Sequence, residues 1–336
     1  MASAALLLEE PYGEFGGVNP TGHSAIYLDH VCAAAPDRLR PCTPGELGVV
    51  ISRYHKVGGY DWLAVPLIPY LYSVASLSEV PASVSPITAA QIRNTYRHNF
   101  LQGIVPDAPG GGIPPGEWTE LVGEAFDRRI YVYQIDTTPE QDEHLIDRFN
   151  DRRNVAQYNM LDRNCADLTR GVFDMIYPRS VHRNIFADWG IMTPKQVARS
   201  LVSYGRKHPE IHLKIFVIPQ VPGTLPRSHS VYGCAEGFVK SKKYVLPSVL
   251  LSPYLTAGMV VVYVVDGRFS IPKNPPPLPL TPTLSTPITA SVAASFTPSI
   301  TGSTAAPGAE SFGFNSLRGS LFNSSVKPVQ ALAETN

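Results

Sequence analysis

The stretch Gly22-His-Ser-Ala-Ile-Tyr-Leu-Asp29 alternates in the manner of a β-strand, with Ser24, Ile26 and Leu28 on one side. A loop rich in proline follows, and the stretch Gly48-Val-Val-Ile-Ser-Arg-Tyr-His55 predicts a partner strand. The sequence therefore predicts that a β-sheet begins close to residue 22.

Further strands and helices follow without a repeating pattern. Thr193-Pro-Lys-Gln196 has the signature of a helix start and predicts a helix over Pro194–Lys207. Arg129–Ile135 and His212–Ile218 are rich in β-branched residues and predict strands. Because the elements show neither a strict βαβ alternation nor an internal repeat, we predict an α+β domain over residues 22–221, with a small mixed or antiparallel sheet packed on helices.

The composition argues against several classes of function. The chain has 28 basic and 28 acidic residues, and this zero net charge offers no electrostatic attraction to a nucleic acid backbone. The glycine run at 110–112 lacks the strand-to-helix context of a phosphate-binding loop. We therefore expect no nucleic acid partner, no cofactor and no metal, and the sequence leaves the oligomeric state open.

The tetrapeptide Asn164-Cys165-Ala166-Asp167 carries the strongest indication of chemistry. Asn is a favourable N-cap and the Asp three residues later can complete a capping box, so Cys165 is expected at the first helical position. The helix dipole and the free amide groups there are expected to lower the pKa of the thiol. Nucleophilic attack also needs a proton acceptor, and His23 stands out because it opens a strand immediately after a glycine.

Together these two stretches resemble the permuted NlpC-type branch of the papain-like fold, which includes the lecithin:retinol acyltransferase-like proteins. In that family a His on the first strand and a Cys in an Asn-Cys pair at a later helix start form the catalytic dyad. The resemblance covers about Gly22 to Val221 and implies that Cys165 is the nucleophile, supported by Asn164, and that His23 is the base. It also implies a thiol-dependent hydrolase or acyltransferase acting on an amide or ester of a cell-envelope peptide or lipid.

The third polar residue of that family lies on the next strand, where Ser52 and His55 compete for the role. The two are three positions apart and would face opposite sides of a strand, so only one can face the dyad. We favour His55, because an imidazole orients and charge-stabilises its neighbour better than a hydroxyl does. The chain departs from the family after the Asn-Cys pair, where Ala166, Asp167 and Leu168 replace an acidic residue and aromatics.

A second interpretation is a membrane-anchored envelope-binding protein that keeps the same scaffold without turnover. A cysteine at a helix start is more often a small buried apolar residue than a nucleophile. The aromatic loop Gly58-Gly-Tyr-Asp-Trp62 would then line a ligand groove or pack in the core. A thiol and imidazole beside an open cleft favour the enzyme, whereas a pair covered by Tyr or Trp favours the binding protein.

Two further cysteines, Cys32 and Cys42, bracket a short loop between the first two predicted strands. This span is easily bridged by a disulfide in an oxidising compartment. A zinc site that combines them with His23 and His30 is a weaker alternative, because the spacing is not that of a structural zinc knuckle.

Residues 244–265 contain no charged side chain, and as a helix they would measure about 33 Å, enough to cross a hydrocarbon core of about 30 Å. Lysines precede this segment, as they do at membrane interfaces. Two internal prolines and the β-branched end of the segment favour a buried strand instead. We favour a membrane-anchoring segment, joined to the domain by a linker over 222–243.

The two ends of the chain are predicted to lie outside the domain. Residues 1–21 form an N-terminal extension that is either a frayed terminus or a remnant of an export signal, and the Pro-, Ser- and Thr-rich residues 266–336 form a disordered tail. A disulfide indicates an exported domain, whereas lysines before a membrane span indicate a cytoplasmic one. We favour a membrane-associated or exported protein that faces the cell envelope.

Overall fold

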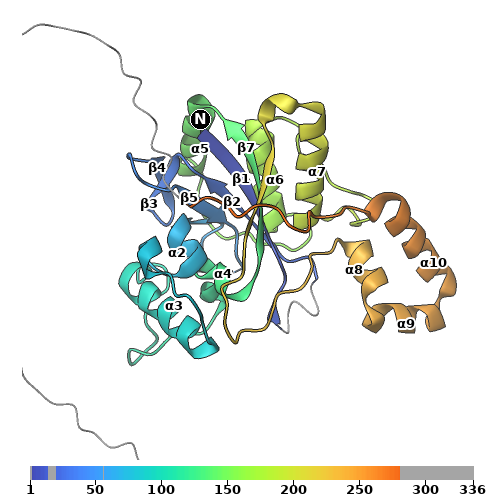
Figure 1. The fold of residues 1–336 in the computed structure, drawn as a ribbon, viewed down its shortest axis with the longest axis horizontal. Coiled ribbons are helices and arrows are strands. Elements are labelled where there is room, and N and C mark those ends of the chain that lie inside the picture. The colour runs from blue at the N-terminus through green and yellow to red at the C-terminus, as the bar shows by residue number, and fades with distance from the viewer. Residues whose placement is uncertain (1, 14–19, 56, 281–336) are drawn as a thin grey trace, which may run out of the picture. The chain divides into compact units, whose positions relative to one another are not determined.

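The centre of the fold is a six-stranded sheet with the order β6-β5-β2-β1-β7-β8, antiparallel throughout (Figure 1). The structure is a computed structural model and describes residues 2–13, 20–55 and 57–280. The strands are β1 (Ala2–Glu9), β2 (His23–Leu28), β5 (Val49–Ser52), β6 (Leu63–Pro66), β7 (Ile130–Thr137) and β8 (Lys214–Ile218). The predicted α+β class, with a sheet packed on helices, is confirmed.

β1 lies in the middle of this sheet, although we predicted residues 1–21 to be an extension outside the domain. It pairs with β2 on one side and, along its whole length, with β7 on the other. All 8 of its residues are buried. A central strand that is covered on both faces shows no alternation of polar and apolar residues. For this reason its apolar run was mistaken for a terminus, and that prediction was wrong.

Helices cover both faces of the sheet and divide the core in two. The face of β2 that carries Ile26 is covered by α5 (Pro139–Asn150), α6 (Cys165–Ile176) and α7 (Pro194–Lys207). The face that carries Ala25 is covered by α2 (Leu67–Tyr72), α3 (Pro86–Phe100) and α4 (Glu124–Asp127). The 3₁₀ helices are η1 (Leu77–Glu79), η2 (Glu117–Leu121) and η3 (Pro209–Ile211). The alternation predicted for β2 is confirmed, because its successive residues enter different cores.

Side-chain caps determine where α5, α6 and α7, the helices on the Ile26 face of the sheet, begin. Thr138, Asn164 and Thr193 each accept a hydrogen bond from the main chain three residues later. At the first two of these starts the third helical residue bonds back to the cap and completes a capping box. The predicted helix over Pro194–Lys207 is confirmed.

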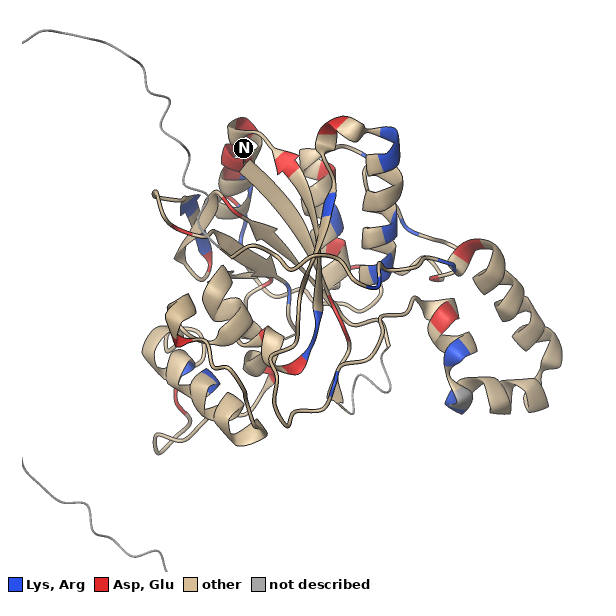
Figure 2. Cartoon of the chain, in the orientation of Figure 1, with Lys and Arg blue, Asp and Glu red and all other residues tan. Residues whose placement is uncertain are grey.

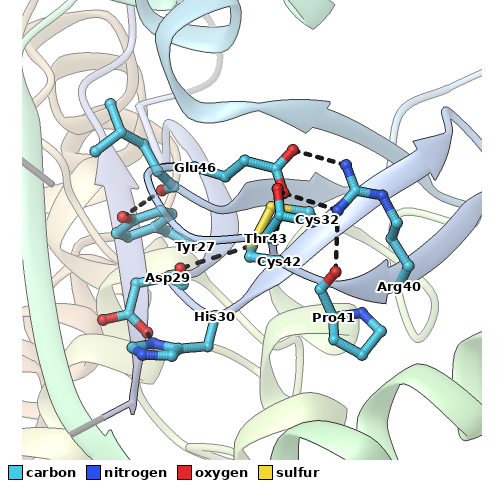
Figure 3. Close-up of a disulfide and its surroundings, with 10 residues drawn as sticks. Tyr27, Asp29, His30, Cys32, Arg40, Pro41, Cys42, Thr43 and Glu46 are labelled. Carbon is cyan, nitrogen blue, oxygen red and sulfur yellow. Dashed lines mark hydrogen bonds and ion pairs between the residues drawn. A yellow bond between two sulfur atoms is a disulfide. The ribbon is translucent and has the colours of Figure 1, made fainter. Parts of the chain in front are cut away.

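A separate two-stranded sheet is made of β3 (Val31–Ala35) and β4 (Arg38–Pro41). A disulfide between Cys32 and Cys42 joins its two strand ends, as Figure 3 shows, and confirms the bridge expected from the sequence. Because the two sulfurs are bonded to each other, they cannot act as thiolate ligands, and the alternative zinc site is not assembled.

Residues 234–267 form short helices in place of the single predicted membrane helix. They are α8 (Cys234–Lys240), α9 (Lys242–Leu251), α10 (Pro253–Val262) and the π-helical turn η4 (Tyr263–Gly267). Over the described ranges, no helix has the length and apolar character needed to cross a membrane. The break falls at Ser252, which has a non-helical conformation, because a residue before proline avoids the helical region. The predicted linker over 222–243 contains α8.

The first part of the predicted disordered tail is ordered beside β8. The main chain of Val217 donates a hydrogen bond to Pro276 at 2.9 Å and accepts one from Leu278 at 3.0 Å. The prediction of disorder is therefore wrong for residues up to 280, because composition does not reveal that a strand edge is available for pairing. The remainder of the predicted tail, 281–336, lies outside the described residues.

Candidate functional site

α6 begins with the residues that the sequence analysis singled out. Asn164 is the N-cap, and its side-chain oxygen accepts a hydrogen bond from the main chain of Asp167 at 3.0 Å. Its side-chain NH₂ group donates to the main-chain oxygen of Met192, also at 3.0 Å. Cys165 follows as the first helical residue, as predicted, and only 8% of its surface is exposed.

The environment of the Cys165 thiol differs from our expectation. Burial raises the pKa of Cys165, while hydrogen bonds from the main chain and side chain of Ser24 act in the opposite direction. The nearby carboxylate of Glu9 adds to the rise, and a hydrogen bond from the main chain of Ala166 opposes it. We expected the helix start to lower this pKa, but burial outweighs the helix start. The thiol is therefore protonated at neutral pH.

The His23 ring is held by Ser52 of the neighbouring strand. His23 Nε2 lies 2.6 Å from Ser52 Oγ, and the Ser52 hydroxyl donates to the main-chain oxygen of Ser24 at 3.3 Å. A hydroxyl has one proton, so when Ser52 donates it to Ser24, Oγ accepts the first bond from a protonated Nε2. In that tautomer Nδ1 is the unprotonated nitrogen of the neutral ring and is the atom able to accept a proton.

The His23 ring is also neutral over the physiological pH range. Burial lowers the pKa of His23 to about 3, and the positive charge of Arg128 acts in the same direction. One face of the ring stacks on Tyr54, with the ring centroids 5.2 Å apart and the planes inclined by 17°. An aromatic side chain thus covers the imidazole in this structure.

β2 brings the Cys165 thiol and the His23 ring near each other, but no hydrogen bond joins them in the described residues. Successive strand residues point to opposite faces. Ser24 faces α6, where its hydroxyl lies 3.5 Å from Thr169 Oγ1, whereas His23 packs against Tyr54 of the opposite core. Within the described residues no hydrogen bond joins Cys165 Sγ to the His23 ring. Attack by the thiol therefore requires the ring and the sulfur to approach each other.

His55, which we favoured as the third polar residue, lies elsewhere. β5 ends at Ser52, so the alternation that we used to compare the two positions does not extend to His55. The exposed ring of His55 lies 3.5 Å from a carboxylate oxygen of Glu117 and 5.3 Å, between centroids, from the ring of Tyr158. In the structure it is Ser52, the competing candidate, that contacts His23.

A groove of about 480 Å³ opens beside α6 and is also lined by α5 and the segment after β5. Trp62 lines it and packs edge-on against Phe149, with the ring centroids 4.8 Å apart. Arg53 links the groove to the start of α6, because its guanidinium binds Asp61 at 2.7 Å and donates to the main-chain oxygen of Asn164 at 3.4 Å. The aromatic loop that we expected to line a groove or to pack does both.

The groove also carries unpaired positive charge. Arg148, Arg152 and Arg153 line it, and none of them forms an ion pair in the part of the chain that the structure describes. Asp167 lines it too, but this carboxylate is paired with Arg183 at 2.5 Å. Small-molecule sites usually measure about 300–1,000 Å³. The groove therefore suits a ligand with an apolar part and an anionic end.

A buried cluster of charges lies near His23 and was not predicted from the sequence. Arg128 lies 3.2 Å from Glu9 and 2.8 Å from Glu124, and the Tyr70 hydroxyl donates to Glu9. Burial raises the pKa of both glutamates, and the positive charge of Arg128 lowers it in each. The available signal was the acidic pair 9–10 at the end of an apolar run, which we assigned to a terminus.

No protein-family model, curated protein or solved structure matches this chain.

Proposed function

We propose that the chain is a thiol-dependent hydrolase or acyltransferase on a permuted NlpC-type papain-like scaffold, with Cys165 as nucleophile and His23 as base. The observation that carries this proposal is the hydrogen bond between His23 Nε2 and Ser52 Oγ, since a ring that donates from Nε2 has Nδ1 available for a proton. Ser52 takes the orienting role that we had assigned to His55. Cys165 supports the proposal by its contact with Ser24, the residue adjacent to His23.

In the proposed reaction the neutral pair reacts without a preformed thiolate. The sulfur of Cys165 attacks the carbonyl carbon while its proton passes to His23 Nδ1, and the carbonyl electrons move onto the oxygen. The main-chain N–H of Cys165, at the helix start, is a donor for that oxyanion. Collapse expels the alcohol or amine, which takes the proton from His23, and water or another acceptor resolves the thioester.

The groove beside α6 supports a substrate that carries a negative charge. Arg53 connects the groove to Asn164, the residue before the nucleophile. An acyl or peptide portion would pack on Trp62 and Phe149, while an acidic group would meet the unpaired arginines. We therefore propose an anionic lipid or peptide, cleaved at an ester or amide, as the substrate class.

The test is acylation of the protein by p-nitrophenyl butyrate, followed by intact mass spectrometry. We expect one butyryl group on Cys165, none in Cys165→Ala, and acylation slowed by about 10²-fold or more in His23→Gln. Cys234→Ala is the matched control, because Cys234 is the other free cysteine. Equal acylation rates in the wild-type protein and His23→Gln would show an ordinary thiol and contradict the proposal.

A second candidate is a binding protein on the same scaffold without turnover, and one observation favours it. Tyr54 covers His23, and Cys165 is buried, so the pair is closed in this structure. Tyr54→Ala separates the two candidates. An enzyme whose pair is opened by substrate should be acylated faster in this variant, whereas a binding protein should remain unacylated with or without Tyr54.

A further inference from the structure

α9 and α10 expose an unusual amount of apolar surface. Just over half of the exposed large apolar side chains in the described residues lie between 244 and 265. Leu250 is 85% exposed, Leu251 86% and Tyr254 90%. Neither helix contains a charged residue beyond the start of α9, as the ribbon colours in Figure 2 show. A soluble surface seldom carries a contiguous apolar patch of this kind without a partner.

The apolar residues of α9 are not confined to one side. Val249, Leu250 and Leu251 are consecutive and all exposed. Because successive helical residues are about 100° apart, these three side chains cover more than half of the helix circumference. A helix that docks on a protein presents an apolar stripe and keeps its opposite side polar, whereas a helix that is apolar all round is typical of a membrane. The pattern therefore favours lipid over a protein groove.

Two hydroxyl groups of these helices bond to each other at the contact between α9 and α10. Thr256 is the buried residue of α10, with 6% of its surface exposed. Its hydroxyl lies 2.7 Å from Ser248 Oγ and donates to the main-chain oxygen of Ser252 at 3.2 Å. Hydrocarbon offers no hydrogen bonds, so a segment that enters it must satisfy its polar groups internally. Ser248 and Thr256 meet that requirement within the helical pair.

The base of this helical pair is tied to α7 by charged contacts. Lys195 of α7 binds Glu236 of α8 at 2.5 Å, and both side chains are buried. Arg199, also on α7, lies 3.4 Å from Asp266 at the other end. These charged contacts are thus made by α8 and by η4, whereas α10 and the part of α9 after its lysines carry no charged residue.

We propose that α9 and α10 insert as a shallow hairpin into one leaflet of a lipid bilayer. Each helix has 10 residues and measures about 15 Å, half of a hydrocarbon core of about 30 Å. A hairpin of this kind enters and leaves on the same side. The positive-inside rule concerns segments that span the bilayer, so for a hairpin the lysines before α9 no longer indicate a cytoplasmic domain and do not conflict with the disulfide. This proposal does not depend on the chemistry of Cys165.

The test is flotation of the full chain with vesicles of phosphatidylcholine, and with vesicles of equal parts phosphatidylcholine and phosphatidylglycerol. We expect the wild-type protein to float with the vesicles and Leu251→Asp to lose binding by about tenfold or more, because an aspartate is costly in hydrocarbon. Ile87→Asp, which changes a residue of α3 that is 72% exposed, is the matched control and should float as the wild type does.

Two other results would overturn the proposal. One is equal flotation of Leu251→Asp and the wild-type protein. The other is a dimer in solution that Leu251→Asp abolishes, without vesicle binding, which would assign the surface to a second copy of the chain. Trypsin added outside the vesicles distinguishes a hairpin from a span: sites at both Lys243 and Arg268 should be cleaved, whereas protection of one would indicate a crossing segment.

Discussion

β1 and the α9–α10 pair are both apolar segments, yet the fold treats them in opposite ways. Every residue of β1 is buried between β2 and β7 and under helices on both faces. In α9 and α10 most of the large apolar side chains remain exposed. Hydropathy therefore identifies apolar surface that must be covered, but it does not identify what covers that surface. In β1 the cover is the protein, and in the helical pair we propose that it is lipid.

The largest expected effect comes from the same substitution made in both regions. Leu7→Ala should lower the free energy of unfolding by about 2–5 kcal/mol, because it opens a cavity at a residue that is 0% exposed. Leu251→Ala should change it by no more than about 0.5 kcal/mol. Urea denaturation of both variants measures the two values. Similar losses in the two variants would show that the helical pair is packed in solution, and would break the comparison.

The β3–β4 hairpin differs from both of these regions, because it lies outside the main sheet and is held by a covalent bond. Replacing both Cys32 and Cys42 with serine should cost about 2.7 kcal/mol, the chain entropy released by opening a loop with a sequence separation of 10. Urea denaturation under non-reducing conditions checks this. Cys234→Ser, at a free cysteine, should have a much smaller effect, and equal losses would contradict the assignment.

The lowered pKa of His23 makes the free energy of unfolding depend on pH. Its folded pKa of about 3 is below the ordinary value of 6.5, so the unfolded chain binds more protons between these values. Stability is therefore lost as pH falls below about 6.5, by about 2 kcal/mol between pH 7 and pH 5 from this residue alone. The measurement is the free energy of unfolding in urea at both pH values.

Other buried groups titrate as well, so the informative quantity is the difference between the wild-type protein and His23→Gln. Glu9 and Glu124 have raised pKa values and act with the opposite sign, but they are present in both proteins. The variant should lose about 2 kcal/mol less on acidification. If both proteins lose the same amount, His23 is not held neutral by the fold.

The smallest expected effect concerns the groove, an apolar surface that also carries cations. Arg148→Glu with Arg152→Glu should weaken the binding of decanoate by about tenfold, or about 1.4 kcal/mol, with little change in stability. Arg206→Glu with Lys207→Glu, both at exposed positions of α7, is the control for net charge, and decanol tests the need for an anion. Calorimetric titration that gives the same affinity for all three proteins would assign decanoate to the exposed helices instead.

Much of the fold could be predicted wherever the signal is local. Thr193 and Asn164 were recognisable as caps, because a cap acts on amides a few residues away. The two faces of β2 were recognisable from their alternation. β1 was not, because a strand covered on both faces has no alternation, and the ordered residues up to 280 were not, because their partner is a distant strand edge.

The candidate site was predicted in part for the same reason. Cys165 at the start of α6 follows from local capping. The raised pKa of Cys165 and the lowered pKa of His23 follow from burial, which depends on the packed core. The partner of His23 could not be chosen from the sequence, because the choice depends on the residue at which β5 ends.

The proline-rich segment beside β8 affects how copies of this chain meet one another. β8 is an outer strand of the sheet, and an open outer strand invites the addition of a strand from another molecule. Pro276 accepts a hydrogen bond from Val217, but prolines have no amide hydrogen with which to extend the ladder further. The segment therefore hinders edge-to-edge pairing between copies of the chain. Such protection matters most for a protein concentrated on a lipid surface, as we propose for this one.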